Sequence, residues 1–93
     1  MLLGLDIGSS SVKAALVDPQ TGREVMAATA PSVEMAIDAP QPGWAEQKPD
    51  DWWRYVIEAL AILRSRHPSA LADVKAIGIS YQMHGLVAVD QSG

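Results

Sequence analysis

The sequence has 93 residues, which is enough for one small domain, and its net charge of −4 lacks the basic surface that nucleic-acid binding requires. It contains no cysteine, which excludes disulfides and thiolate metal sites. No apolar run reaches membrane-spanning length and no basic segment precedes the apolar start, so we expect a cytoplasmic protein with no nucleic-acid and no membrane partner.

The first predicted element is a buried strand over residues 2–7 that contains one acid, Asp6. Burying a carboxylate costs several kcal/mol unless a cation or hydrogen-bond donors meet it, so an acid at this place indicates chemistry. The residues after the strand suit a turn whose backbone amides and side chains donate to phosphate oxygens. They are Gly8, Ser9, Ser10, Ser11 and Lys13.

This turn differs from the two common phosphate-binding motifs, because the sequence contains neither G-x-x-x-x-G-K-[ST] nor G-x-G-x-x-G. On the short motif alone a second interpretation stays open, namely an ordinary hairpin with a serine-rich turn and a salt-bridged Asp6. The choice between the two interpretations depends on the segments that follow.

Two more strands and a long irregular segment follow the turn. A strand over 12–18, a turn over 19–22 and a strand over 24–30 would form an antiparallel meander with the first strand. The segment 31–42 contains three prolines, which lack a backbone donor, and Gly43 permits a tight bend. We expect this segment to run over the surface.

A helix is predicted over residues 49–67. Pro49 suits its first position, acids follow in the first turn, basic residues lie near its end, and Pro68 terminates it. Trp52 and Tyr55 flank the apolar stripe that we expect to pack on the sheet, and we assign the aromatic side chains to packing rather than to a ligand. The predicted stripe consists of Trp53, Val56, Ile57, Leu60 and Leu63.

Two further strands are predicted after the helix, a buried parallel strand over 74–80 and another over 86–90. The loop between them carries Met83 and His84. Open α/β sheets place ligands at the carboxyl ends of buried strands, so these two residues are candidates for ligand contact. Taken alone, they are equally compatible with a core methionine and a loop histidine that is satisfied by its neighbours.

Three segments together resemble the FGGY carbohydrate kinases over essentially the whole chain. The first is the Asp-x-Gly-Ser turn, which resembles the first phosphate loop of the sugar-kinase, actin and chaperone-ATPase superfamily. The second, residues 41–53, is similar to the family passage Pro-Gly-Trp-x-Glu followed by Pro-x-x-Trp-Trp. The third, residues 77–85, resembles the next strand and substrate loop, and its Gln-Met-His-Gly is the version found in the xylulokinase branch, where glycerol kinases carry Arg-Glu in place of Met-His.

The resemblance implies an α/β fold of the ribonuclease H-like, actin and sugar-kinase type, with an antiparallel meander followed by parallel strands in a mixed sheet. Residues 1–93 would then be part of an N-terminal domain. The implied reaction transfers the γ-phosphoryl group of ATP, with Mg²⁺, to D-xylulose and gives D-xylulose 5-phosphate. A ribulose, erythritol or glycerol kinase of the same family stays open, as does a binding module of this fold without chemistry.

The resemblance also assigns roles to residues of this chain. Asp6 would act in catalysis by orienting Mg²⁺ or its waters, and Met83 and His84 would contact the sugar, where a thioether that packs and an imidazole that donates or accepts suit a ketopentose. Trp44 and Glu46 could line the sugar pocket or anchor the crossing segment, and we favour anchoring. The ATP phosphates would be held by Gly8, Ser9, Ser10, Ser11 and Lys13.

The family's general base and adenine site lie beyond residue 93, so we expect this chain alone to be inactive. None of the acids in the sequence is a convincing substitute for that base. We also expect a homo-oligomer, because a sheet that ends at an unpaired strand offers backbone groups to other chains.

Overall fold

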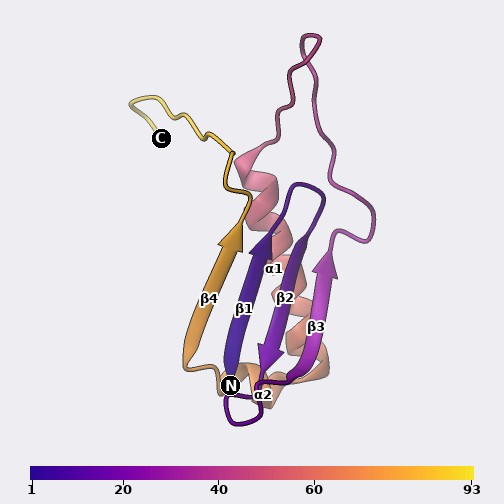
Figure 1. Ribbon diagram of the computed structural model, residues 1–93, viewed down its shortest axis with the longest axis vertical. Coiled ribbons are helices and arrows are strands. Elements are labelled where there is room, and N and C mark those ends of the chain that lie inside the picture. Colours follow the sequence, from indigo (N-terminus) through magenta and orange to yellow (C-terminus); the bar gives the residue numbers. More distant parts are fainter.

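Four strands form one mixed sheet in the computed structural model, which describes residues 1–93, and a long helix covers one face of that sheet (Figure 1). The strand order is β3-β2-β1-β4. The helices and strands, in chain order, are β1 (Leu2–Ile7), β2 (Val12–Val17), β3 (Glu24–Ala30), α1 (Pro49–Arg66), α2 (Pro68–Ala72) and β4 (Ala76–Tyr81).

The sheet has the mixed topology that the sequence predicts. β1 pairs antiparallel with β2, β2 pairs antiparallel with β3, and β4 returns to pair parallel with β1. The crossover from β3 to β4 runs through the surface segment 31–48 and the two helices, as a parallel connection requires. The predicted fold class is therefore confirmed.

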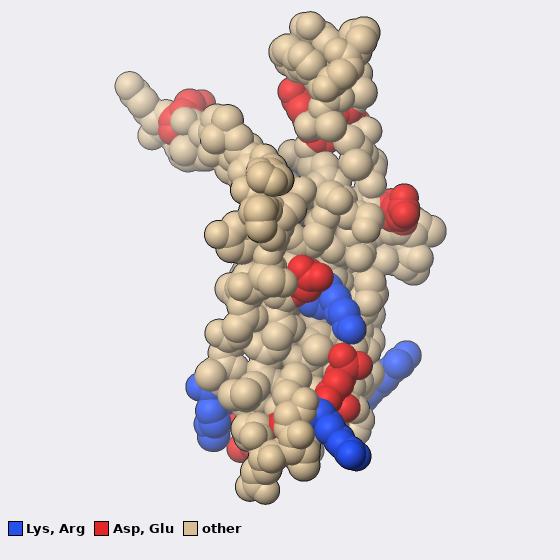
Figure 2. Space-filling model, viewed as in Figure 1, with Lys and Arg blue, Asp and Glu red and all other residues tan.

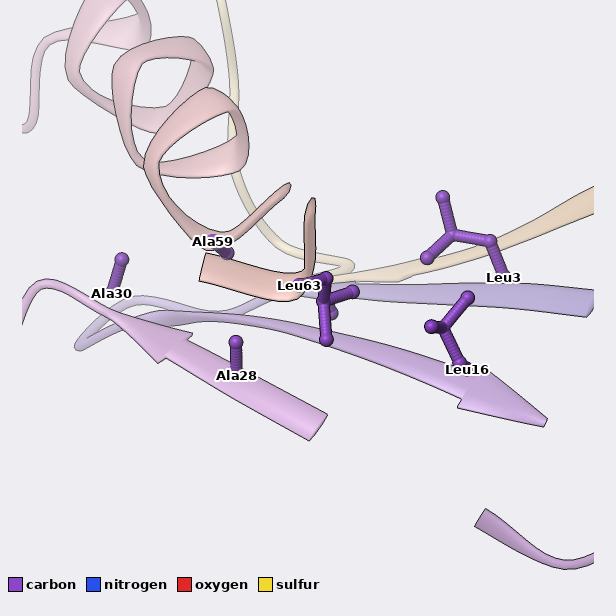
Figure 3. Close-up of a cluster of buried hydrophobic side chains, with 7 residues drawn as sticks. Leu3, Leu16, Ala28, Ala30, Ala59 and Leu63 are labelled. Carbon is purple, nitrogen blue, oxygen red and sulfur yellow. The ribbon is translucent and has the colours of Figure 1, made fainter. Parts of the chain in front are cut away.

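The core lies between the sheet and α1 (Figure 3). Leu63 is fully buried against the sheet, and burying a leucine side chain stabilises a fold by about 1.5–3 kcal/mol. Alanines at the contact let the helix backbone approach the strands closely. The buried cluster consists of Leu3, Ala14, Leu16, Ala28, Ala30, Ala59 and Leu63.

The buried face of α1 differs from the predicted stripe. Trp53 and Ile57 are exposed, by 67% and 48%, whereas Val56, Ala59 and Leu63 are buried. With about 3.6 residues per turn, these three buried residues share one face of the helix, and Trp53 and Ile57 point away from it. Ala59 on this face packs in the same buried cluster as alanines of β2 and β3.

The predictions for the last third of the chain need two corrections and one addition. The strand expected to be buried is β4, and all six of its residues are exposed because it is an edge strand with no layer packed on it. Residues 86–90 form no strand, since no strand lies beyond β4 to pair with them. Pro68 ends α1 as predicted, but it also begins the short α2, because proline fits the first turn of a helix.

The segment 31–48 forms an arm that projects beyond the end of the sheet (Figure 1), and the stretch 31–42 that was predicted to lie on the surface is mostly exposed. Backbone hydrogen bonds of 2.8 and 2.7 Å pair Asp38 with Glu46 across the arm. Its anchor is Met35, which is buried together with Val12 of β2 and Val56 of α1. The arm is therefore fixed to the end of the sheet where β1 turns into β2.

At the opposite end of the sheet, Met1 before β1 contacts the segment that leads into β4. The Met1 ammonium lies 3.1 Å from an Asp73 carboxylate oxygen, and the Met1 carbonyl accepts from the Lys75 amide. The hydrogen bond from this ammonium, its charge and the charge of Lys75 hold the pKa of Asp73 below its ordinary value. No helix in the structure is long and apolar enough to cross a membrane.

Candidate functional site

Three segments meet at one end of the sheet (Figure 1): the turn 8–11, the arm, and the stretch after β4. β1 and β4 are parallel, so their carboxyl ends lie side by side, which is where open α/β sheets bind ligands. The Gln82 amide donates to the Ile7 carbonyl at 3.2 Å and extends this pairing by one residue. The turn 8–11, called the phosphate turn below for its predicted role, and the predicted sugar loop that carries Met83 and His84 therefore leave the sheet from neighbouring positions.

The phosphate turn is closed by one hydrogen bond and leaves three amides open. The Gly8 amide donates to the Ser11 carbonyl at 3.0 Å, while the amides of Ser9, Ser10 and Ser11 donate to no acceptor in the chain. A Cβ on Gly8 would lie 3.1 Å from the Ser11 carbonyl oxygen, a tight contact that would push this carbonyl outward, so the close turn favours glycine there. Successive unpaired amides in a turn form a concave site for an anion such as phosphate.

Asp6 is exposed, which corrects the expectation of a buried carboxylate. Successive residues of a strand face opposite sides, and Asp6 faces the side of the sheet away from the core, on which no helix packs. The Ser80 hydroxyl of β4, its partner in register, donates to one Asp6 carboxylate oxygen at 2.8 Å. The carboxylate is thus oriented by β4 and stays open to solvent and to a ligand.

Lys13 lies opposite Asp6 in the sheet but pairs with Glu24. The Lys13 ammonium is 3.4 Å from a Glu24 carboxylate oxygen. Glu24 lies opposite Val17, which is four residues further along β2 from the turn than Lys13. The ammonium is therefore directed away from the turn. Both side chains are half-exposed, and such pairs contribute about 0–1 kcal/mol, so this one competes weakly with a phosphate. Figure 2 shows acidic and basic side chains in a row on this open face.

A cleft of about 880 Å³ joins the phosphate turn to the predicted sugar loop. Ser9 lines it together with Met83 and His84, while Gln47 and Trp52 form part of the wall under the arm. The sequence-predicted residues Ser9, Met83 and His84 are therefore brought together. Asp6 and Lys13 instead line a second hollow of about 380 Å³ on the open face of the sheet, with Ser80.

The arm contributes residues whose roles the sequence left open. Trp44 is half-exposed and does not line the cleft, and Glu46 lines it while its backbone pairs across the arm. Gln47 was missed as a site residue although its side chain bonds to the phosphate turn. The signal available in the sequence was its place between Glu46 and Pro49 in the family passage, which does not reveal a contact 38 residues away.

Asp6 fits a magnesium ion only in company with a phosphate-bearing ligand. No three His, Cys, Asp or Glu side chains converge to hold a metal by themselves. Mg²⁺ is commonly held by one or two carboxylates plus phosphate oxygens and waters, and the single exposed carboxylate of Asp6 meets that requirement at the end of the strand that leads into the turn.

The mixed sheet, the turn with open amides and the adjoining cleft are the features of the N-terminal part of a carbohydrate kinase. The family model for the FGGY family of carbohydrate kinases, N-terminal domain, matches residues 1–93. The chain belongs to this family.

Several curated relatives are xylulose kinases. The chain is 40% identical over 90 residues to the xylulose kinase of Escherichia coli and 42% identical over 90 residues to that of Bacillus subtilis. Each comparison covers 97% of this chain and 17% of the relative. The chain therefore spans about one sixth of the length of these relatives.

Solved structures share the fold. The xylulose kinase of Rhodospirillum rubrum superposes with a TM-score of 0.85 at 29% identity, covering 99% of this chain and 18% of that one. The gluconate kinase of Lactobacillus acidophilus has a TM-score of 0.74 at 25% identity, covering 89% of this chain and 15% of that one. The backbone is thus shared by kinases named for different sugars.

Proposed function

We propose that residues 1–93 form the N-terminal part of a kinase that uses ATP and Mg²⁺ to phosphorylate D-xylulose, giving D-xylulose 5-phosphate. The observation that carries this proposal is the cleft in which Ser9 of the phosphate turn lies with Met83 and His84. Phosphoryl transfer depends mainly on positioning two substrates and stabilising charge, and one cleft that adjoins both loops would hold the sugar beside the terminal phosphate.

The turn would hold the phosphates. Its three open amides and the hydroxyls of Ser9, Ser10 and Ser11 supply donors, and Gly8 keeps the turn tight enough for them to converge. Lys13 would leave Glu24 to add positive charge. A magnesium ion, when bound, would offset charge on the phosphate oxygens, and Asp6, held by Ser80, would fix the position of that ion or its waters.

The cleft favours a neutral sugar over one that carries a carboxylate. Glu46 is the one charged residue in its lining, and no lysine or arginine lines it. A gluconate carboxylate would be repelled by Glu46 without gaining a cation, whereas the hydroxyls of D-xylulose can bond to His84 and its carbon chain can pack on Met83. Gluconate phosphorylation is therefore the second candidate, and it is disfavoured.

The whole protein should phosphorylate D-xylulose in an assay of ATP consumption, and a panel of D-ribulose, erythritol, glycerol and gluconate should react more slowly. Phosphorylation of another member of the panel with a higher kcat/KM would assign a different substrate. Sugar and nucleotide binding without any turnover would support the alternative of a binding module.

The 93-residue chain alone should show no D-xylulose-dependent ATP turnover, because the general base and adenine site implied by the family resemblance are not among its residues.

We also propose that this chain associates with copies of itself. β4 is an edge strand that exposes Ile77, Ile79 and Tyr81, and open edges pair with other strands. Light scattering should show dimers or larger species, and a monomer at high concentration would contradict this. The proposal includes a cytoplasmic location.

A further inference from the structure

We propose that Gln47 is a positioning residue of the phosphate turn: its side-chain amide holds the Ser9 carbonyl and so aims the Ser10 amide at the phosphate. This inference rests on the proposed function. It is carried by hydrogen bonds that join the turn, the arm and the first turn of α1 through one side chain.

The Gln47 side chain uses both of its donor hydrogens on backbone carbonyls. Its Nε2 donates to the Ser9 carbonyl at 2.5 Å and to the Ala36 carbonyl at 3.4 Å. Its Oε1 accepts from the Trp52 indole Nε1 at 3.1 Å. Three segments that are distant in sequence, namely the turn, the arm and α1, therefore meet at this amide.

Trp52 fixes which way the amide points. An indole N–H can only donate, so it must face the Gln47 oxygen, and the Gln47 nitrogen then faces the two carbonyls. Trp52 is partly buried against the cluster of Val12, Met35 and Val56, which holds the indole in place. The orientation of the Gln47 amide thus follows from the hydrogen-bonding chemistry of all three partners.

Holding the Ser9 carbonyl orients the amide on the other side of the same peptide bond. In a planar trans peptide the C=O of one residue and the N–H of the next point in opposite directions. Because the Ser9 carbonyl is directed to Gln47, the Ser10 amide is directed away from the arm. The Ser10 carbonyl accepts from the Met35 amide at 2.8 Å, which orients the Ser11 amide in the same way.

Gln47 lines the cleft but is poorly placed to bind the sugar itself. Both of its hydrogens and one lone pair of its oxygen are already used within the protein. A sugar hydroxyl could gain a donor from Gln47 only by breaking a bond to Ser9 or Ala36. The residue should therefore act on phosphate binding, through the turn, and leave sugar binding to Met83 and His84.

The test is Gln47→Glu in the whole protein. The carboxylate still accepts from Trp52, but it has no hydrogen for Ser9 or Ala36 and repels both carbonyl oxygens. Each lost hydrogen bond corresponds to about 2- to 12-fold, and Gln47→Glu loses two, so kcat/KM for ATP should fall by about fivefold or more. KM for D-xylulose should change by less than about twofold. A matched control is Gln41→Glu, the same change at an exposed position of the arm whose side chain makes no hydrogen bond, which should leave both constants unchanged.

Amide hydrogen exchange supplies a readout that is independent of turnover. The buried Met35 amide donates to the Ser10 carbonyl, so a displaced turn should release it and speed its exchange in Gln47→Glu but not in Gln41→Glu. Trp52→Phe, which keeps the ring packing and removes the orienting N–H, should change ATP kinetics and Met35 exchange in the same direction by a smaller factor. If Gln47→Glu fails to fold, Trp52→Phe alone tests whether the Gln47 amide positions the turn.

Unchanged Met35 exchange together with unchanged ATP kinetics would overturn the inference. An increase in KM for D-xylulose with ATP kinetics intact would also overturn it, because Gln47 would then be a sugar ligand. If the unaltered protein does not phosphorylate D-xylulose, the proposed function fails, and Met35 exchange still tests the inference by itself.

Discussion

Replacing Gly8 by alanine tests whether the phosphate turn must be as tight as the structure shows. The added Cβ would lie 3.1 Å from the Ser11 carbonyl oxygen, closer than an ordinary contact. That oxygen accepts the 3.0 Å bond from the Gly8 amide that closes the turn. The Ser11 carbonyl must therefore move by a few tenths of an ångström, and the closing bond weakens.

Weakening this bond should cost about 0.5–1.5 kcal/mol, or up to about tenfold in an equilibrium constant. A shift of the Ser11 carbonyl would also displace the three open amides of the turn. The weaker phosphate binding should then appear as a rise in KM for ATP and a fall in kcat. Steady-state kinetics of the whole protein, with ATP and D-xylulose varied separately, measures both. KM for D-xylulose should stay within about twofold, because β4 and its loop are not displaced.

Gly4→Ala is the control. Gly4 lies on β1, four residues before Gly8, and an added Cβ there would lie 3.9 Å from the Ala15 carbonyl oxygen, which is an ordinary contact. It should leave the kinetics of ATP unchanged. If Gly8→Ala left ATP kinetics at the unaltered level, or if both alanine variants lost activity equally, the proposed dependence on a tight turn would be refuted.

Three further outcomes are expected. His84→Ala should lower kcat/KM for D-xylulose by about 5- to 150-fold, the equivalent of about 1–3 kcal/mol for a lost polar contact, with ATP affinity little changed; an unaltered sugar kcat/KM would remove His84 from the site. Asp6→Asn, which can still accept from Ser80, should depress kcat more than about tenfold with a smaller effect on sugar KM, and loss of sugar binding instead would reverse the assignment of the two loops. The hydrogen bond from the Met1 ammonium is the main cause of the lowered pKa of Asp73. The Asp73 carboxylate should therefore stabilise the fold fully at pH values above the ordinary aspartate pKa of about 3.9, and this stabilisation should be lost as the pH falls through the lowered pKa. Urea midpoints of Asp73→Asn and the unaltered protein should therefore converge in acid, and a gap that persists there would contradict the assignment.

The elements with strong local signals were predicted well. The β1 to β3 meander and α1 begin and end within one residue of the predicted bounds, since Pro49, Pro68 and the turn at 19–22 mark them directly. The turn after β1 was predicted because a glycine followed by three serines is typical of turns, whereas its binding of phosphate stays a prediction. These features depend on residues close together in the chain, which a sequence displays.

The features that failed depend on what lies beside each element in space. A buried Asp6 was inferred from an apolar strand, but burial also requires a second layer, and the face carrying Asp6 has none. The apolar run 86–90 resembles a strand, yet strands form only with a partner. The buried face of α1 contains Ala59 and leaves Trp53 exposed, and Gln47 bonds to a carbonyl 38 residues away. No local pattern encodes these contacts.

A crystal structure of the whole protein with D-xylulose and a non-hydrolysable ATP analogue tests the central claim most directly, namely that one cleft holds the sugar beside the phosphate turn. The account predicts the terminal phosphate within hydrogen-bond distance of the Ser10 amide and the sugar against Met83 and His84, with its primary hydroxyl facing that phosphate. A sugar bound away from Met83 and His84, or a terminal phosphate that does not contact the turn, would contradict it.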